Sequence, residues 1–240
     1  MTSKDKGLKI ETLSLKIGDK QILDNLSFSV EEGKSVGFIG DNGAGKTTTI
    51  KILAGINEPD AGDVKFDGLS VFETKGQNLV GYLPEKTYFP EYLTGREFVK
   101  FIADLQNIKD FDIEALFKEL KIHHAIDTKI KNYSKGMMQR LGFISLLINK
   151  DMRYLLLDEP MSGLDHVGQI ETIEIVKKLK AQGISVLITS HHMNEIESIC
   201  DSIVFIRKGK IIDNRSVADI LQEYPSLKDY YLAMAAKAEI

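Results

Sequence analysis

Residues 40–47 read Gly40-Asp41-Asn42-Gly43-Ala44-Gly45-Lys46-Thr47 and fill every fixed position of the phosphate-binding loop pattern G-x-x-x-x-G-K-[ST]. Glycine lets backbone N–H groups curl around an anion because no Cβ stands in the way. In this pattern the Lys46 ammonium reaches the terminal phosphates of a nucleotide, and the Thr47 hydroxyl is a ligand for Mg²⁺. The stretch therefore predicts a binding site for a nucleoside triphosphate.

The segments on both sides of this loop fit a strand followed by a helix. Val36-Gly37-Phe38-Ile39 is apolar and predicts a buried strand, and residues from Thr48 to Ala54 predict a helix that ends at Gly55. A helix that begins near Gly45 directs the positive end of its dipole at the bound anion. The residues that we expect to bind the nucleotide here are Asn42, Gly43, Ala44, Gly45, Lys46, Thr47 and Thr48.

Length and composition fit one large α/β domain, or a domain with a subdomain, since the chain has 240 residues of which 43% are hydrophobic. No apolar run approaches the roughly 20 residues that span a bilayer, and the polar start, residues 1–6, is unlike a secretory signal. The single cysteine, Cys200, fits a reducing compartment. A net charge of −4 with mixed signs gives no electrostatic reason to expect a nucleic-acid partner. We expect a cytoplasmic protein.

Hydrophobic periodicity changes along the chain. In the first third, Leu26, Phe28 and Val30 alternate with polar residues, which predicts a half-buried strand within a β-rich layer around the phosphate loop. From about residue 151 apolar strands and helical segments alternate, which predicts a mainly parallel sheet covered by helices. The fold class that we expect is therefore α/β, with a second, antiparallel β layer.

The middle of the chain has a helical period. Thr94 followed by Glu97 predicts a capping box, and behind it Phe98, Phe101, Ile102 and Leu105 fall at helical spacing. We therefore expect a single nucleotide-binding domain over 1–240, made of a core with its β layer (1–85 and 151–215), a helical subdomain (86–150) and a C-terminal helical extension (216–240).

Two carboxylates end a second apolar strand. Tyr154-Leu155-Leu156-Leu157 is followed by Asp158 and Glu159, and the C-terminal ends of parallel strands face the ligand crevice. Asp158 would then lie beside the phosphate loop and hold Mg²⁺ through water. Glu159 could orient or deprotonate the water that attacks the nucleotide.

Three further segments, together with the phosphate loop, resemble motifs of the ATP-binding cassette (ABC) proteins. The eight residues from Asp158 to Asp165 resemble the Walker B motif and D-loop of that family. Those from Tyr133 to Arg140 resemble its signature segment, and Thr189-Ser190-His191 resembles its switch-histidine loop. Order and spacing match from about residue 8 to residue 215, so the chain is identified as a member of this family by its motifs.

The resemblance implies a RecA-like P-loop NTPase core that forms a head-to-tail dimer and sandwiches two ATP molecules with Mg²⁺. Each ATP would contact the phosphate loop of one copy and the signature residues Ser134 and Gly136 of the other, where a hydroxyl and N–H groups at a helix N-terminus suit the γ-phosphate. Asp165 would cross the dimer axis, and His191 would sense the γ-phosphate. The catalytic residues implied in this way are Glu159, His191 and Lys46.

Several positions depart from the family pattern. Glu85 stands where the family usually has glutamine, and a carboxylate there can still reach Mg²⁺, so the expected metal ligands are Thr47, Glu85 and Asp158. Lys135 and Met137 replace a glycine and a glutamine that are common in the signature segment. Ile17 occupies the position of the aromatic residue expected to stack on adenine, which predicts weaker stacking.

The function expected from the resemblance is ATP hydrolysis that drives a separate membrane permease, with a lean towards export. The resemblance places the docking site for the permease just after Glu85. Aromatic residues are enriched at interfaces, and four of them surround Pro84 and Pro90 in this region: Tyr82, Tyr88, Phe89 and Tyr92. The alternative is a soluble cassette ATPase that acts in DNA repair or on the ribosome. A GTPase would need Asn-Lys-x-Asp, and the nearest string is Asn149-Lys150-Asp151-Met152. A subunit that binds ATP without hydrolysing it conflicts with the intact catalytic set.

Overall fold

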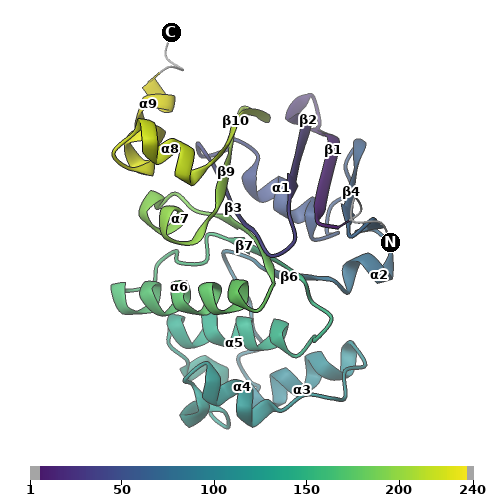
Figure 1. Cartoon of the computed structure of the whole chain (residues 1–240). Coiled ribbons are helices and arrows are strands. Elements are labelled where there is room, and N and C mark those ends of the chain that lie inside the picture. The colour runs from purple at the N-terminus through teal and green to yellow at the C-terminus, as the bar shows by residue number, and fades with distance from the viewer. Residues whose placement is uncertain (1–5, 237–240) are drawn as a thin grey trace.

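The computed structural model describes residues 6–236. Residues 1–5 of the predicted polar start, and residues 237–240 of the predicted C-terminal extension, lie outside the described residues. Two sheets organise this part of the chain, one of six strands in the order β10-β9-β3-β8-β7-β6 and one of four strands in the order β2-β1-β4-β5. Figure 1 shows the helices α3 to α6 on one side of the six-stranded sheet and the four-stranded sheet on the other.

The six-stranded sheet is parallel except at one edge, which confirms the expected α/β class. Its strands are β3 (Ser35–Gly40), β6 (Val80–Leu83), β7 (Tyr154–Asp158), β8 (Ser185–Thr189), β9 (Ser202–Arg207) and β10 (Lys210–Ser216). Only β10 pairs antiparallel, with β9. Because β3, β7 and β8 are adjacent and parallel, the phosphate loop, the two carboxylates and the loop after Thr189 meet at one end of the sheet.

The four-stranded sheet is antiparallel and packs on the first helix. It consists of β1 (Leu8–Ile17), β2 (Lys20–Val30), β4 (Ala61–Phe66) and β5 (Leu69–Ser70). The inward face of β2 shares a buried apolar cluster with β3 and with α1 (Lys46–Leu53). In this cluster Phe28 stacks on Phe38 with ring centroids 5.3 Å apart. The β-rich layer thus holds the helix that follows the phosphate loop.

Helices fill the middle of the chain. They are α2 (Thr74–Gln77), α3 (Gly95–Leu105), α4 (Ile113–Glu119) and α5 (Lys135–Leu147), with short 3₁₀ turns at His123–Ala125 and Ile130–Asn132. The capping box of Thr94 and Glu97 is present at the start of α3. On this helix Phe98 is buried, but Phe101 and Leu105 are exposed. The helical spacing identified the helix correctly, whereas the apolar face that it predicted is only partly covered.

The last third adds helices around the sheet. α6 (His166–Ala181) and α7 (Met193–Ile199) join the parallel strands, and α8 (Val217–Glu223) and α9 (Leu227–Ala236) follow β10. The ring of Tyr230 on α9 is buried, and its hydroxyl donates a hydrogen bond to Asp213 at 2.7 Å. Within residues 6–236 no helix is long and apolar enough to cross a membrane.

Candidate functional site

The phosphate loop links β3 to α1 and needs glycine where it meets the helix. Gly45 caps α1 with a φ of +111°, and a Cβ at this position would lie 2.6 Å from the side chain of Leu23. No side chain caps this helix, so its first N–H groups are available to an anion. The geometry therefore presents backbone donors and the positive end of a helix dipole to the same point.

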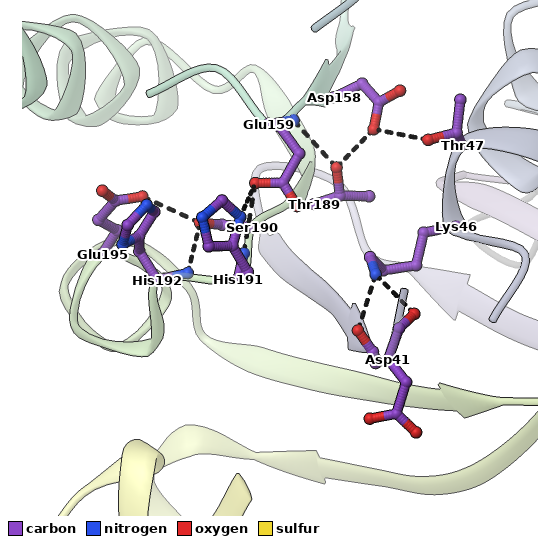
Figure 2. A network of polar contacts seen from close by, with 11 residues as sticks. Asp41, Lys46, Thr47, Asp158, Glu159, Thr189, Ser190, His191, His192 and Glu195 are labelled. Atoms are coloured by element: carbon purple, nitrogen blue, oxygen red, sulfur yellow. Dashed lines mark hydrogen bonds and ion pairs between the residues drawn. The ribbon is translucent and has the colours of Figure 1, made fainter. Parts of the chain in front are cut away.

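Lys46 lies buried inside the loop. Its Nζ donates hydrogen bonds to the backbone oxygens of Gly40 at 2.7 Å and Asp41 at 3.0 Å (Figure 2). Burial lowers the pKa of Lys46, and the nearby carboxylates Glu159 and Asp158 oppose that effect. The ammonium is thus placed close to two carboxylates, Glu159 and Asp158, whose negative charge it offsets.

Asp158 and Thr47 form the part of the site that suits a hard cation. The Asp158 side chain is buried, and its Oδ1 accepts hydrogen bonds from the hydroxyls of Thr47 at 3.4 Å and Thr189 at 2.7 Å. Carboxylate, hydroxyl and water oxygens are the ligands that Mg²⁺ prefers, and Mg²⁺ usually keeps several waters beside substrate phosphates. In residues 6–236 no group of three His, Cys, Asp or Glu side chains is placed to hold a metal by itself. The residues therefore fit a magnesium ion that arrives with a triphosphate.

Glu159 follows Asp158 and is held in a constrained conformation. Its φ of +47° lies in the left-handed region, which is uncommon for a residue with a side chain. Its N–H donates to the backbone oxygen of Thr189 at 3.1 Å and to the Thr189 hydroxyl at 3.0 Å. Its Oε2 accepts from the N–H of His191 at 3.3 Å and lies 2.8 Å from Nδ1 of that residue. One carboxylate oxygen is thus held by His191, and Oε1 has no hydrogen-bond partner within residues 6–236 and is available to water.

The loop after β8 fixes the position of His191. The Ser190 hydroxyl donates to Glu195 at 3.0 Å and accepts from the N–H of His192 at 2.9 Å (Figure 2). Glu195 is buried, and burial raises the pKa of its carboxyl group. This buried pair holds the turn on which the exposed His191 ring stands.

The residues of the phosphate loop and the two carboxylate segments surround one cavity of about 390 Å³. Glu85, an exposed side chain after β6, lies on its wall, and its role in binding Mg²⁺ stays a prediction. The lining residues are Gly40, Asp41, Asn42, Glu85, Glu159, His191 and Tyr231. The cavity thus collects groups from the end of β3 and the loop after it, from the segments that follow β6, β7 and β8, and from α9.

Ser134, Gly136 and Asp165 lie in a different place from the phosphate loop. They line a separate cavity of about 330 Å³ between the start of α5 and the start of α6. The oxygen of Ser134 accepts from the N–H of Met137 at 3.2 Å, and the Asp165 carboxylate accepts from the N–H of Gly168 at 2.8 Å, so both residues cap helices. One chain therefore does not bring its signature residues to its own phosphate loop.

Sequence reasoning missed several groups of this site. The motif that contains Thr189 does not predict that its hydroxyl joins Asp158 to Glu159. The Asp41 carboxylate is held by Arg207 and Tyr231, which come from β9 and α9. No local pattern links these residues, so only the fold could identify them.

Ile17 is the predicted contact for the nucleotide base, and its role stays a prediction. It ends β1, pairs with Lys20 across the turn, and 61% of its surface is exposed. Aromatic stacking adds about 0.5–1.5 kcal/mol beyond area burial. Ile17→Tyr is therefore expected to raise ATP affinity roughly two- to tenfold, measured by competition binding with ATP and GTP. Strong native preference for ATP, with no gain from tyrosine, would place the base elsewhere.

Comparisons with known proteins agree with this geometry. The model of the ABC transporter family matches residues 23–162. An uncharacterised ABC transporter ATP-binding protein, YdbJ of Bacillus subtilis, is 38% identical over 85% of this chain and 67% of its own length. The lantibiotic transport ATP-binding protein SrtF of Streptococcus pyogenes is 34% identical over 85% of this chain and 89% of its own length.

A solved ATP-binding subunit of an ABC transporter has a TM-score of 0.86 and 26% identity, covering 96% of this chain and all of that chain. The chain spans between 58% and 70% of the length of four bacterial relatives that are 35–38% identical to it. The family match covers more than half of the sequence and includes the phosphate loop, Asp158 and Glu159. The chain therefore belongs to the ATP-binding proteins of the ABC transporter family and has a P-loop NTPase fold.

Proposed function

We propose that this protein hydrolyses ATP and so powers a separately encoded membrane permease, in an export system. The contact between Glu159 and His191 carries the proposal, because a carboxylate with one held and one available oxygen suits the activation of water. That carboxylate shares a cavity with the phosphate loop. Relatives described as transport ATP-binding proteins support the transport role, and the resemblance of the signature segment supports export.

The chemistry follows from the positions of the side chains. Lys46 and the N–H groups of α1 would bind the β- and γ-phosphates. Glu159 would orient water for attack on the γ-phosphate and accept its proton, while His191 holds the Glu159 carboxylate and faces the same cavity. Mg²⁺, held by Thr47, Asp158 through water, and Glu85, would neutralise phosphate charge. In this proposal Lys46 serves in phosphate binding, and Glu159 serves in proton transfer.

We further propose that two copies act together. Ser134 and Gly136 line a cavity separate from the phosphate loop of their own chain, so a second copy is needed to bring a signature segment to each ATP. The exposed Asp165 would lie near the axis of that dimer. Each ATP would then be enclosed by groups from both copies.

The docking surface for the permease is proposed to be the segment after Glu85. Tyr88 is 88% exposed and Tyr92 is 73% exposed, whereas Phe89 between them packs edge-on against Phe98 at 5.0 Å between ring centroids. The partly buried Phe89 anchors the segment against the core, while Tyr88 and Tyr92 are exposed. A protein that docks on a permease and uses ATP would work at the cytoplasmic face of the membrane.

Loss of the two tyrosines tests this function. In Tyr88→Ala combined with Tyr92→Ala, we expect ATP hydrolysis by the isolated protein to stay within about twofold, since neither residue lines the nucleotide cavity. Co-purification of a polytopic membrane protein with the double variant should fall roughly tenfold or more relative to the unmodified protein. Ile56→Ala, which removes a 59% exposed apolar side chain elsewhere, is the matched control. Stable capture of ribosomes or DNA, with no membrane partner, would favour the soluble alternative.

A further inference from the structure

The C-terminal helix α9 contacts the phosphate loop through Asp41. The Tyr231 hydroxyl donates a hydrogen bond to Oδ1 of Asp41 at 3.2 Å. Nε of Arg207, at the end of β9, donates to Oδ2 of the same carboxylate at 3.1 Å. Both oxygens of Asp41 are therefore held by groups that lie 166 and 190 residues further along the chain.

The two partners of Asp41 are themselves fixed. The ring of Tyr231 stacks on the buried ring of Phe205, with centroids 5.4 Å apart and planes at 21°. Nη2 of Arg207 donates to the backbone oxygen of Met234 in the last turn of α9 at 3.0 Å, and its guanidinium lies 5.4 Å from the centre of the Phe205 ring. Helix α9, β9 and the phosphate loop are thus joined by one set of contacts.

Asp41 connects this set to the nucleotide-binding lysine. Its backbone oxygen accepts from Lys46, while its side chain binds Arg207 and Tyr231 (Figure 2 shows the first of these contacts). Tyr231 also lines the cavity that contains Glu159 and His191. A carboxylate in the loop would repel a triphosphate, and the guanidinium of Arg207 offsets that charge. The contacts therefore both shape the loop and reduce its negative potential.

We propose that Tyr231 and Arg207 are positioning residues of the nucleotide site, and that they set ATP affinity by holding the phosphate loop through Asp41. This proposal rests on the proposed ATP-binding function and extends it to the C-terminal helix. Neither Glu159 nor His191 forms a hydrogen bond with Tyr231 or Arg207. We therefore expect a change in α9 to alter the affinity for ATP more than the rate of ATP hydrolysis.

Tyr231→Phe tests the proposal, and Tyr230→Phe is its matched control. Both tyrosines lie on α9, and each variant removes a hydroxyl that donates a hydrogen bond to a carboxylate. The hydroxyl of Tyr230 donates to Asp213, and this side chain is far more buried than that of Tyr231. Phenylalanine at position 231 keeps the stacking on Phe205. We expect Tyr231→Phe to weaken binding of a fluorescent ATP analogue roughly three- to tenfold, with KM raised in parallel and kcat within about twofold. Tyr230→Phe should lower the melting temperature and leave affinity unchanged.

A double-mutant cycle with Asp41→Ala, which removes both side-chain oxygens, separates positioning from a general loss of packing. If Tyr231 acts through Asp41, Tyr231→Phe should add little to the effect of Asp41→Ala. Equal effects of the two tyrosine variants on affinity, additive effects with Asp41→Ala, or tighter binding by Tyr231→Phe would each overturn the proposal. If one of these outcomes is found and the unmodified protein binds ATP, the role of Tyr231 is refuted but the proposed function is not. If the unmodified protein does not bind ATP, the proposed function itself is refuted.

Discussion

Glu159→Gln is expected to reduce ATP turnover by roughly two orders of magnitude or more while leaving ATP binding intact. The amide keeps the size of the carboxylate and can still accept a hydrogen bond from His191, which now holds Oε2. It loses the basicity needed to accept a proton from water. ATP should then persist between two copies, because binding proceeds and hydrolysis does not.

Two measurements check this result. Steady-state phosphate release gives the loss of turnover, and size-exclusion chromatography with ATP should show a two-copy species that ADP does not produce. Glu85→Gln is the informative comparison, since it makes the same replacement in the same cavity. Full turnover by Glu159→Gln, together with loss of turnover in Glu85→Gln, would mean that the base is Glu85.

Local patterns account for most of what the sequence predicted. The phosphate loop, the strand before Asp158 and the capping box at Thr94 each depend on residues close together in the chain, and each is present in the structure. The meeting of Lys46 with Asp158 was also predictable, because it follows from the rule that parallel strands open at one end of a sheet.

Contacts between distant residues could not be predicted in this way. β10 has alternating half-buried residues that resemble many surface segments, and its role as an edge strand depends on pairing with β9. Tyr231 meets Asp41 only because α9 packs back against the sheet, and neither residue stands at a fixed position of a motif. Phe101 and Leu105 are exposed because no other element within residues 6–236 covers that part of α3. The helical spacing of apolar residues does not specify which part of the apolar face is covered.

The separation of the two cavities also has a physical meaning. The signature residues are held by the helix caps at α5 and α6, while the phosphate loop is fixed by β3 and α1. Both halves of the proposed ATP site, the phosphate loop and the signature segment, are therefore formed without nucleotide. In the proposed dimer, only the position of one copy relative to the other would change when ATP binds. If two copies share ATP as proposed, a site divided between two surfaces would couple ATP binding to their approach, which is the motion that the proposed transport function needs.

Lys46→Ala is expected to weaken ATP binding roughly 10- to 100-fold, because hydrogen bonds to charged groups are worth about 1.5–3 kcal/mol. The change removes the ammonium that lies near Glu159 and Asp158, so the phosphates would face these carboxylates without the positive charge of Lys46. It also removes the hydrogen bonds from Lys46 to the backbone oxygens of Gly40 and Asp41, of which Asp41 keeps the N–H of Ala44 as a donor. Titration with ATP and with ADP measures the loss, which should be larger for ATP because it carries the additional γ-phosphate.

Lys51→Ala provides the control, since it removes a lysine from the last turn of the same helix α1 and outside the cavity. Its ATP affinity should equal that of the unmodified protein. Thermal unfolding without nucleotide separates binding from folding, because a collapsed loop would lower the melting temperature before any ligand is added. Normal affinity of Lys46→Ala for both nucleotides would show that Lys46 serves only to hold the oxygens of its own loop, and that the helix dipole and the backbone N–H groups bind the phosphates alone.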